Sequence, residues 1–214
     1  MLASLLGLQA AGVAFHVGSQ QREPARWSGS VAEAALLFGR LRQAGLRPWL
    51  LDVGGGLPAD HEGGHPALDA YVGTILDAVA RHFPDLCPQL VVEPGRGVVG
   101  DAGTLHARVL GVTWRGGRRW VYLDAGVYSG LVETLGEAIR YRLRTDRAGD
   151  PVGPAVLAGP TCDSVDVLYE HEPVVLPLTL REGDRVRFGA AGAYTTTYST
   201  VGFNGFAPLP TVLV

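Results

Sequence analysis

Four short segments of this 214-residue sequence combine glycine with side chains that can do chemistry. Backbone N–H groups of glycine can approach an anion closely, and an arginine side chain presents two parallel donors to the same group. The glycines at 54–56 and Arg96 therefore predict a cradle for a phosphate group. The four segments are residues 16–19 (His-Val-Gly-Ser), 54–56 (Gly-Gly-Gly), 93–97 (Glu-Pro-Gly-Arg-Gly) and 192–194 (Gly-Ala-Tyr).

The elements that must position these residues follow from the hydrophobic pattern. The first three segments each follow an apolar run of strand length, and these runs alternate with helical periodicity. Such a β-α-β-α-β series predicts parallel strands joined by right-handed crossovers. Because the carboxyl ends of the strands form the site in α/β barrels, we expect the three loops to meet around one ligand. The expected strands are residues 12–17, 48–53 and 90–93, and the expected helices are a tail at 2–8, then 31–43 and 68–82.

Beyond about residue 103 the helical periodicity fades and short β-rich runs take over. The expected fold class is therefore α/β followed by β, with domains at residues 1–103 and 104–214. One helical turn is expected at 133–139, and the alternation of Arg140, Arg142 and Arg144 is interpreted as a solvated strand face. The expected strands of this mainly antiparallel domain are residues 105–114, 119–123, 155–158, 174–178 and 185–188.

Composition excludes several classes of protein. Hydrophobic residues make up 47% and charged residues 18%, which is typical of a globular chain and not of a disordered one. The net charge of -3 gives no general attraction to nucleic acid or anionic membranes, and neither a bilayer span nor a leader is evident. Cys87 and Cys162 stand far apart without a CxxC pair, so we expect no disulfide framework, no metal site and a cytoplasmic location.

The eighteen basic residues are all arginine, and the sequence contains no lysine. An arginine side chain cannot lose its proton near neutral pH and cannot form a Schiff base. Covalent amine–carbonyl catalysis by a side chain of this chain is therefore excluded.

Each candidate residue also has an ordinary interpretation. His16 can be a turn residue, a glycine triplet can be a plain turn, Glu93 can pair with Arg96, and Cys162 can be an inert buried thiol. What favours a site is the combination of these residues at successive strand ends.

Six ordered motifs carry a resemblance to a known family. The sequence closely resembles the C-terminal portion of the pyridoxal-phosphate-dependent ornithine/diaminopimelate/arginine decarboxylases, which share an alanine-racemase-type barrel. The resemblance implies the last three strands of a (β/α)8 TIM-type barrel followed by a β domain, whose tail at 192–214 packs back toward the barrel. The motifs are Gly12-Val-Ala-Phe-His-Val-Gly-Ser19, Leu51-Asp-Val-Gly-Gly-Gly56, Glu93-Pro-Gly-Arg96, Gly159-Pro-Thr-Cys-Asp163, Gly192-Ala-Tyr194 and Phe203-Asn-Gly-Phe206.

The resemblance implies pyridoxal 5'-phosphate as the cofactor. His16 looks like the imidazole that stacks on the cofactor ring, and Glu93 like the carboxylate that pairs with the pyridine nitrogen. A carboxylate there keeps the ring nitrogen protonated, so that the ring can accept the electrons left by loss of CO₂. The implied phosphate ligands are Ser19, Gly54, Gly55, Gly56, Arg96 and Tyr194.

The resemblance also implies a homodimer with two shared sites. Cys162 and Asp163 resemble a pair that reaches into the partner subunit's site, where Cys162 returns a proton after decarboxylation and Asp163 engages the amine end of the substrate. Glu137, or Glu133, stands where the family reads the distal end of the substrate. An ordinary exposed helical turn explains either glutamate equally well.

The implied reaction is decarboxylation of a basic amino acid. Residues 159–166 look more like the ornithine- or lysine-type enzymes than the diaminopimelate decarboxylases, and this segment does not separate ornithine from lysine. Ornithine, with putrescine as product, is the expected substrate, and lysine or diaminopimelate is the alternative. Family members carry the Schiff-base lysine in an N-terminal half that has no counterpart here. We therefore expect a fragment with three of eight barrel strands, inactive and marginally stable by itself. A lysine-free regulatory partner of a complete subunit is one alternative. A site for another phosphorylated ligand is a second, which the motif Cys162-Asp163 argues against.

Overall fold

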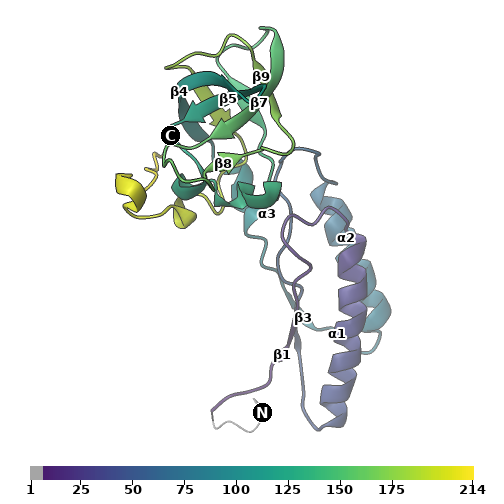
Figure 1. The fold of residues 1–214 in the computed structure, drawn as a ribbon. Helices are drawn as coiled ribbons and strands as arrows, with labels where there is room; N and C mark the ends of the chain where they lie inside the picture. Colours follow the sequence, from purple (N-terminus) through teal and green to yellow (C-terminus); the bar gives the residue numbers. More distant parts are fainter. Residues whose placement is uncertain (1–6) are drawn as a thin grey trace. The chain divides into compact units, whose positions relative to one another are not determined.

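The computed structural model describes residues 7–214 and divides into two compact units (Figure 1). The first unit comprises the described residues up to 59 together with residues 65–98, and the second comprises residues 60–64 and 99–214. The helix tail expected at residues 2–8 lies, except for its last two residues, outside the described residues.

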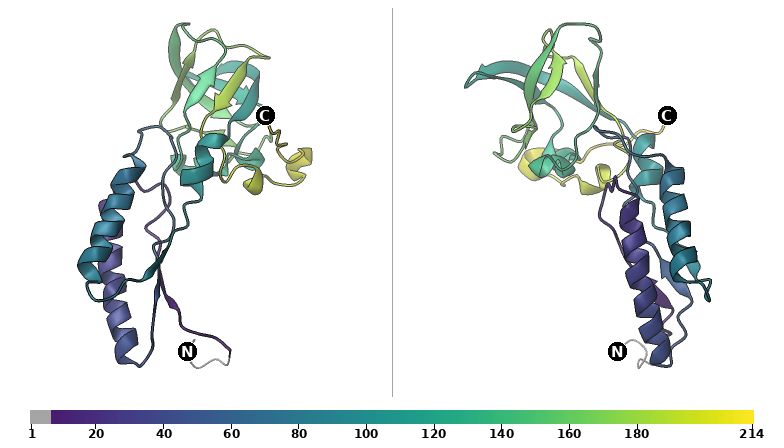
Figure 2. Two further views of the ribbon diagram at one scale, coloured as in Figure 1. Left: turned by 180° about the vertical axis from the view of Figure 1, so that it is seen from behind. Right: turned by 90° about the vertical axis from the view of Figure 1, so that its right-hand side faces the viewer.

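The first unit is built on three parallel strands, β1 (Gly12–Ala14), β2 (Leu50–Asp52) and β3 (Gln89–Val91), in the order β1-β2-β3. Helix α1 (Ala25–Gln43) joins β1 to β2, and helix α2 (Leu68–His82) joins β2 to β3. The two helices lie alongside each other on the same side of the strands (Figure 2). The predicted β-α-β-α-β series is confirmed.

Burial of aromatic side chains explains where the two helices lie. Tyr71, Ile75 and Ala78 form one buried face of α2, which begins and ends where its periodicity predicts. Helix α1 begins at Ala25, six residues before the expected start. Its first turn is fixed by Trp27, which is buried, packs edge-on against Tyr71 and donates a 3.1 Å hydrogen bond from Nε1 to the carbonyl oxygen of Val53.

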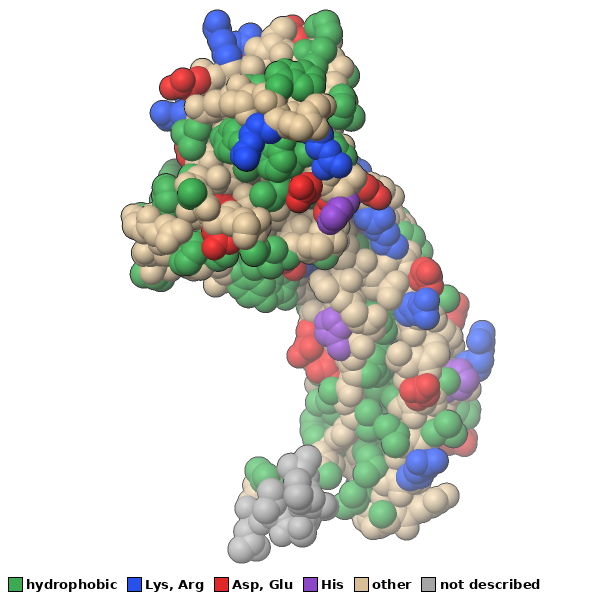
Figure 3. Space-filling model, viewed as in Figure 1, with side chains coloured by type: hydrophobic (Ala, Val, Ile, Leu, Met, Phe, Trp, Pro, Cys, Tyr) green, Lys and Arg blue, Asp and Glu red, His purple; other side chains and the backbone are tan. Residues whose placement is uncertain are grey.

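Strands β1 and β3 are the two edges of this sheet among the described residues. Large hydrophobic side chains are exposed on the same unit, as Figure 3 shows for one face. An unpaired parallel edge is unusual in a barrel, where every strand has two neighbours. The exposed set is Leu8, Leu36, Leu37, Trp49, Leu68, Val72, Leu76, Leu90, Val92 and Val98.

The second unit is a seven-stranded sheet around one hydrophobic core. The strands follow the order β6-β10-β4-β5-β7-β8, with β9 pairing β7, and every pair except β5 with β7 is antiparallel. This confirms the expected mainly antiparallel domain. The strands are β4 (Leu105–Arg115), β5 (Arg118–Leu123), β6 (Leu143–Thr145), β7 (Val152–Ala158), β8 (Val167–Leu168), β9 (Val174–Pro177) and β10 (Arg185–Phe188).

Short helical segments follow several strands. The helical turn expected at 133–139 is η4 (Val132–Glu137), and the face expected to be solvated is only partly so, because Arg140 pairs with Glu62 and Glu137. Among the described residues, no helix combines the length and the apolar character needed to cross a bilayer. The remaining segments are α3 (Arg96–Val99), η2 (Gly100–Ala102), η3 (Val127–Ser129), η5 (Thr196–Tyr198) and η6 (Phe203–Gly205).

Candidate functional site

The backbone beyond the three parallel strands brings the first group of predicted residues together. The N–H of Phe15 donates to the carbonyl oxygen of Asp52 at 3.1 Å, and the N–H of Glu93 donates to that of Gly54 at 2.9 Å. These bonds continue the sheet past the ends of β1, β2 and β3. His16, the glycines at 54–56 and Glu93 therefore lie side by side beyond the carboxyl ends of the three strands.

Gly55 stands at the centre of this group. A β-carbon on Gly55 would lie 2.6 Å from the backbone oxygen of Glu93 and 3.1 Å from Nε2 of His16. Any other residue would have to displace one of these two neighbours. Gly54 is under a similar constraint, because its φ is +68° and a β-carbon would lie 2.0 Å from the oxygen of Phe15. The glycines are required by close approach of three backbone segments.

The His16 ring is oriented by the turn that follows it. Its Nδ1 accepts a 2.9 Å hydrogen bond from the N–H of Gly18. An Nδ1 that accepts leaves the proton of the neutral ring on Nε2, which is the atom beside Gly55. The ring is exposed, as is Ser19 in the same turn. The imidazole therefore presents a fixed tautomer to the surface of the glycine-rich loop.

Arg96 and Glu93 differ in burial although they stand three residues apart. Arg96, the first residue of α3, is buried, and Glu93 is exposed. Gly97, the residue after Arg96, approaches Leu57 so closely that a β-carbon would lie 2.7 Å from the leucine Cβ. The start of α3 is thus held against Leu57, which follows the glycine triplet in the same unit.

Cys162 and Asp163 lie on the loop between β7 and β8 in the second unit. Cys162 is an exposed free thiol with a φ of +63°, a left-handed conformation that costs a non-glycine residue about 1–2 kcal/mol. Asp163 accepts a 2.8 Å hydrogen bond from the N–H of Val165. Desolvation, and then the neighbouring Asp163 carboxylate, raise the pKa of the Tyr128 phenol.

The Glu137 carboxylate already binds other residues of the second unit. Its carboxylate accepts hydrogen bonds from the N–H groups of His171 (2.7 Å) and Glu172 (3.2 Å), and it forms a 3.0 Å ion pair with Arg140. Arg140 also lies 4.7 Å from the centre of the Tyr169 ring. The oxygens of Glu137 thus already have partners that hold a loop and a cation in place.

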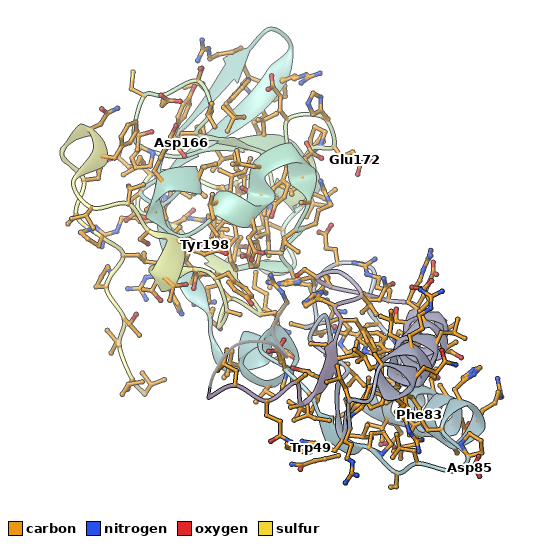
Figure 4. The ribbon with its side chains drawn as sticks, turned by 90° about the horizontal axis from the view of Figure 1, so that it is seen from below. Trp49, Phe83, Asp85, Asp166, Glu172 and Tyr198 are labelled. Atoms are coloured by element: carbon orange, nitrogen blue, oxygen red, sulfur yellow. The ribbon has the colours of Figure 1, made fainter. Side chains whose placement is uncertain are left out.

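Tyr194 lies in the second unit with a φ of +56°. Its ring is exposed and its centre is 5.5 Å from that of Tyr198, which Figure 4 labels. Three predicted site residues, Glu137, Cys162 and Tyr194, are thus left-handed without being glycine, and such residues gather at functional sites.

Sequence reasoning missed the roles of Tyr128 and Asp166 near Cys162. The ring of Tyr128 stacks on that of Phe203 with ring centres 4.2 Å apart, and Asp166 is buried at the end of the loop that carries Cys162. Phe203 was noted only as part of a motif. Tyr128 follows β5, and Asp166 lies between β7 and β8. The parallel pairing of β5 with β7 brings these two segments together, and the sequence alone does not reveal that pairing.

Comparison with known proteins shows which proteins this chain is similar to. Residues 1–100 match the family model described as pyridoxal-dependent decarboxylase, pyridoxal binding domain. The lysine/ornithine decarboxylase of Selenomonas ruminantium is 35% identical over 97% of this chain and 51% of that protein. The antizyme inhibitor 2 of Xenopus laevis is 30% identical over 98% of this chain and 48% of that protein.

Solved structures give the same result for the fold. The lysine/ornithine decarboxylase of Vibrio vulnificus, complexed with cadaverine, superposes with a TM-score of 0.84 at 34% identity, covering 96% of this chain and 55% of that one. Further matches are named ornithine, arginine and diaminopimelate decarboxylases. The chain spans about half the length of the curated relatives it matches. The predicted fold class, a partial barrel followed by a β domain, is confirmed.

Proposed function

We propose, on the premise that this chain belongs to the pyridoxal-dependent decarboxylases, that it forms part of an enzyme that removes the carboxyl group of a basic amino acid, with ornithine favoured. The observation that carries the proposal is the convergence of His16, Gly55 and Glu93 at the ends of three parallel strands. The carboxyl ends of barrel strands are where the sites of such barrels lie.

The glycine-rich loop fits the phosphate group of pyridoxal 5'-phosphate. Gly55 carries no side chain, so no β-carbon shields its backbone N–H from an approaching ligand. The N–H of Gly54 already donates to Asp52 at 2.9 Å, which leaves Gly55 and Gly56 as the backbone donors in the proposal. Ser19, Arg96 and Tyr194 are proposed to complete the phosphate ligands.

His16 and Glu93 are proposed to hold the ring of the cofactor. The imidazole, fixed by its bond to Gly18, supplies a flat face for stacking. The exposed Glu93 carboxylate is proposed to keep the pyridine nitrogen protonated. When bound, the cofactor supplies an electron sink for the pair of electrons released with CO₂.

Cys162, Asp163 and Glu137 are proposed to act on the substrate. The exposed thiol of Cys162 can donate its proton to the carbon that has lost CO₂, and Asp163 can pair with the distal ammonium of a basic amino acid. Glu137 is the second proposed acid for that ammonium. Asp163 is favoured over Glu137, whose carboxylate already binds Arg140 and two backbone N–H groups.

The proposal places Cys162 and Asp163 in the site of a partner subunit, so that a homodimer shares two sites. It also assigns the Schiff-base lysine to a part of the enzyme other than this chain, since these 214 residues contain none. Two free cysteines without a disulfide fit a reducing compartment, and the proposal therefore includes a cytoplasmic location.

A substrate panel tests the proposal. The full-length natural protein, saturated with pyridoxal phosphate, is incubated with ornithine, lysine, arginine and diaminopimelate, and the amine products are quantified. We expect putrescine from ornithine at the highest kcat/KM. Faster turnover of another amino acid would replace ornithine but keep the reaction, and no CO₂ release from any of the four would overturn the proposal.

A second candidate function is that of an inactive partner of a complete decarboxylase. Two observations favour it: the chain has no lysine, and one of its relatives is named an antizyme inhibitor. Purified chain mixed with a complete decarboxylase separates the two functions. Formation of a mixed dimer with altered turnover supports the partner role, and no association on size-exclusion chromatography contradicts it.

A further inference from the structure

Asp166 is a buried carboxylate that the reaction outlined above does not use. It is 2% exposed and follows the Cys162-Asp163 pair by three residues (labelled in Figure 4). Its Oδ1 accepts a 2.7 Å hydrogen bond from the N–H of Val127, and its Oδ2 accepts from both the N–H (3.1 Å) and the hydroxyl (2.7 Å) of Thr161. A buried carboxylate with three donors is a fixed structural element of its surroundings.

Asp166 joins the segment after β5 to the segment after β7, and both segments begin at the same end of these neighbouring strands. Strands β5 and β7 are parallel neighbours, with Tyr122 opposite Ala158, so the residues that follow each strand emerge together. Val127 belongs to the segment after β5, and Thr161 to the segment after β7. The carboxylate thereby ties the loop of Cys162 to the segment that carries Tyr128.

Two glycines leave room for the carboxylate. A β-carbon on Gly126 would lie 2.1 Å from Oδ1 of Asp166, and one on Gly159 would lie 2.2 Å from the same atom. Neither distance is compatible with a side chain. The Asp166 carboxylate therefore occupies a slot that both neighbouring segments are shaped to fit.

Both neighbours of Cys162 in the sequence are hydrogen-bonded to Asp166, one to its side chain and the other to its backbone N–H. Thr161, just before it, is bonded to the carboxylate, and its carbonyl oxygen also accepts a 2.8 Å bond from the side chain of Asn204. Asp163, just after it, accepts a 3.0 Å bond at its carbonyl oxygen from the N–H of Asp166. The left-handed conformation of Cys162 persists because both flanking residues are fixed.

We propose that Asp166 is a positioning residue that holds the Cys162 thiol and the Asp163 carboxylate in the geometry their chemistry requires. The inference rests on the proposed function for the roles of Cys162 and Asp163. It adds that the proton donor and the carboxylate are positioned by one buried side chain, which also connects them to Tyr128.

The reactivity of the two cysteines tests this without any measurement of turnover. Cys162 and Cys87 are both exposed, so the rate of alkylation of Cys162 by iodoacetamide can be measured against Cys87 in the same molecule. In Asp166→Asn the side-chain NH₂ replaces one carboxylate oxygen. Because NH₂ cannot accept a hydrogen bond, the donors that bonded that oxygen lose their acceptor. We expect the Cys162:Cys87 rate ratio to change about threefold or more, because groups in one hydrogen-bond network are coupled.

Two further variants keep this test decisive. Thr161→Val removes one of the three hydrogen bonds without changing shape, and is expected to shift the ratio in the same direction by less. Asp184→Asn is the matched control, because Asp184 bonds Arg147 and the N–H of Arg181 and has no bond to the Cys162 loop. A ratio unchanged in both Asp166→Asn and Thr161→Val, with the protein folded, would overturn the proposal.

Turnover of the full-length protein separates positioning from plain stabilisation. If Asp166 acts through Cys162, then Asp166→Asn lowers kcat in the wild-type background and has little further effect in a Cys162→Ala background. Equal fold losses in both backgrounds would contradict the proposal. Absence of decarboxylation in the wild type would instead refute the proposed function, while the alkylation ratio would still report on Asp166.

Discussion

Nε2 of His16 faces Gly55 so closely that a β-carbon on the glycine would lie 3.1 Å away, and the same β-carbon would lie 2.6 Å from the oxygen of Glu93. Three strand ends that are distant in sequence thus meet at one residue without a side chain. The relationship explains why the imidazole, the carboxylate and the glycine loop can serve one ligand.

Gly55→Ala should therefore weaken the binding of pyridoxal phosphate. Forcing an extra methyl group into a packed site costs about 1–3 kcal/mol, which corresponds to roughly five- to a hundredfold in affinity. Equilibrium dialysis with the full-length protein measures the change. Gly73→Ala is the control, because nothing lies within 4 Å of that position in α2, and it should leave affinity unchanged while stabilising the protein by about 0.5–1 kcal/mol.

Asp163→Asn and Glu137→Gln should have different effects on the enzyme. Loss of the Asp163 charge is expected to raise KM for ornithine roughly tenfold or more, the value of a hydrogen bond to a charged group. Glu137→Gln is expected mainly to lower stability, because the Glu137 carboxylate bonds Arg140 and the N–H groups of His171 and Glu172. Steady-state kinetics and urea denaturation of both variants check this, and the reverse pattern would make Glu137 the ammonium ligand.

Tyr169→Phe should destabilise the second unit by about 1–3 kcal/mol. The buried Tyr169 hydroxyl donates to the oxygen of Ile139 (3.2 Å) and accepts from the N–H of Tyr141 (3.1 Å), and burial raises the pKa of this phenol. Phenylalanine keeps the ring beside Arg140 but leaves the N–H of Tyr141 unsatisfied. Urea denaturation gives the difference. Tyr198→Phe, at an exposed tyrosine, should change the free energy of unfolding by almost nothing.

Stability should fall with acid partly through Asp184. The hydrogen bond from Arg147 holds the pKa of Asp184 below its ordinary value of 3.8. Since the folded-state pKa is the lower one, the stabilisation is present above the unfolded value and is lost as the pH falls through the folded value. The stability difference between wild type and Asp184→Asn should therefore shrink as the pH is lowered from neutrality to well below 3.8. A difference that stays constant over this range would remove Asp184 from the acid response.

Local patterns predicted the regular elements where one sequence signal dominated. Helix α2 has a clean apolar face and an uninterrupted periodicity, so its bounds are the predicted ones. Helix α1 was predicted to begin late because Ser28, Gly29 and Ser30 interrupt the periodicity, while the packing of Trp27 against Tyr71 decides its start. Strand β8, two residues long, carries no detectable periodicity.

The residues of the candidate site likewise fall into those that a local sequence pattern predicts and those that it does not. His16, Gly55 and Glu93 were predicted because each stands at or just beyond the carboxyl end of an apolar strand. Tyr128 and Asp166 were not, because their contacts depend on the parallel pairing of β5 with β7, two strands separated in sequence by more than twenty residues. The local sequence around Tyr128 and Asp166 does not indicate which distant strands pair, so their contacts could not be predicted from it.

The most direct measurement of the central claim is CO₂ release from carboxyl-labelled ornithine by the full-length protein and its Glu93→Gln variant, both with bound cofactor quantified. The account predicts release by the wild type and a rate lower by about 10²–10³-fold in the variant, with cofactor still bound. Equal rates for the two proteins at equal cofactor content would contradict it.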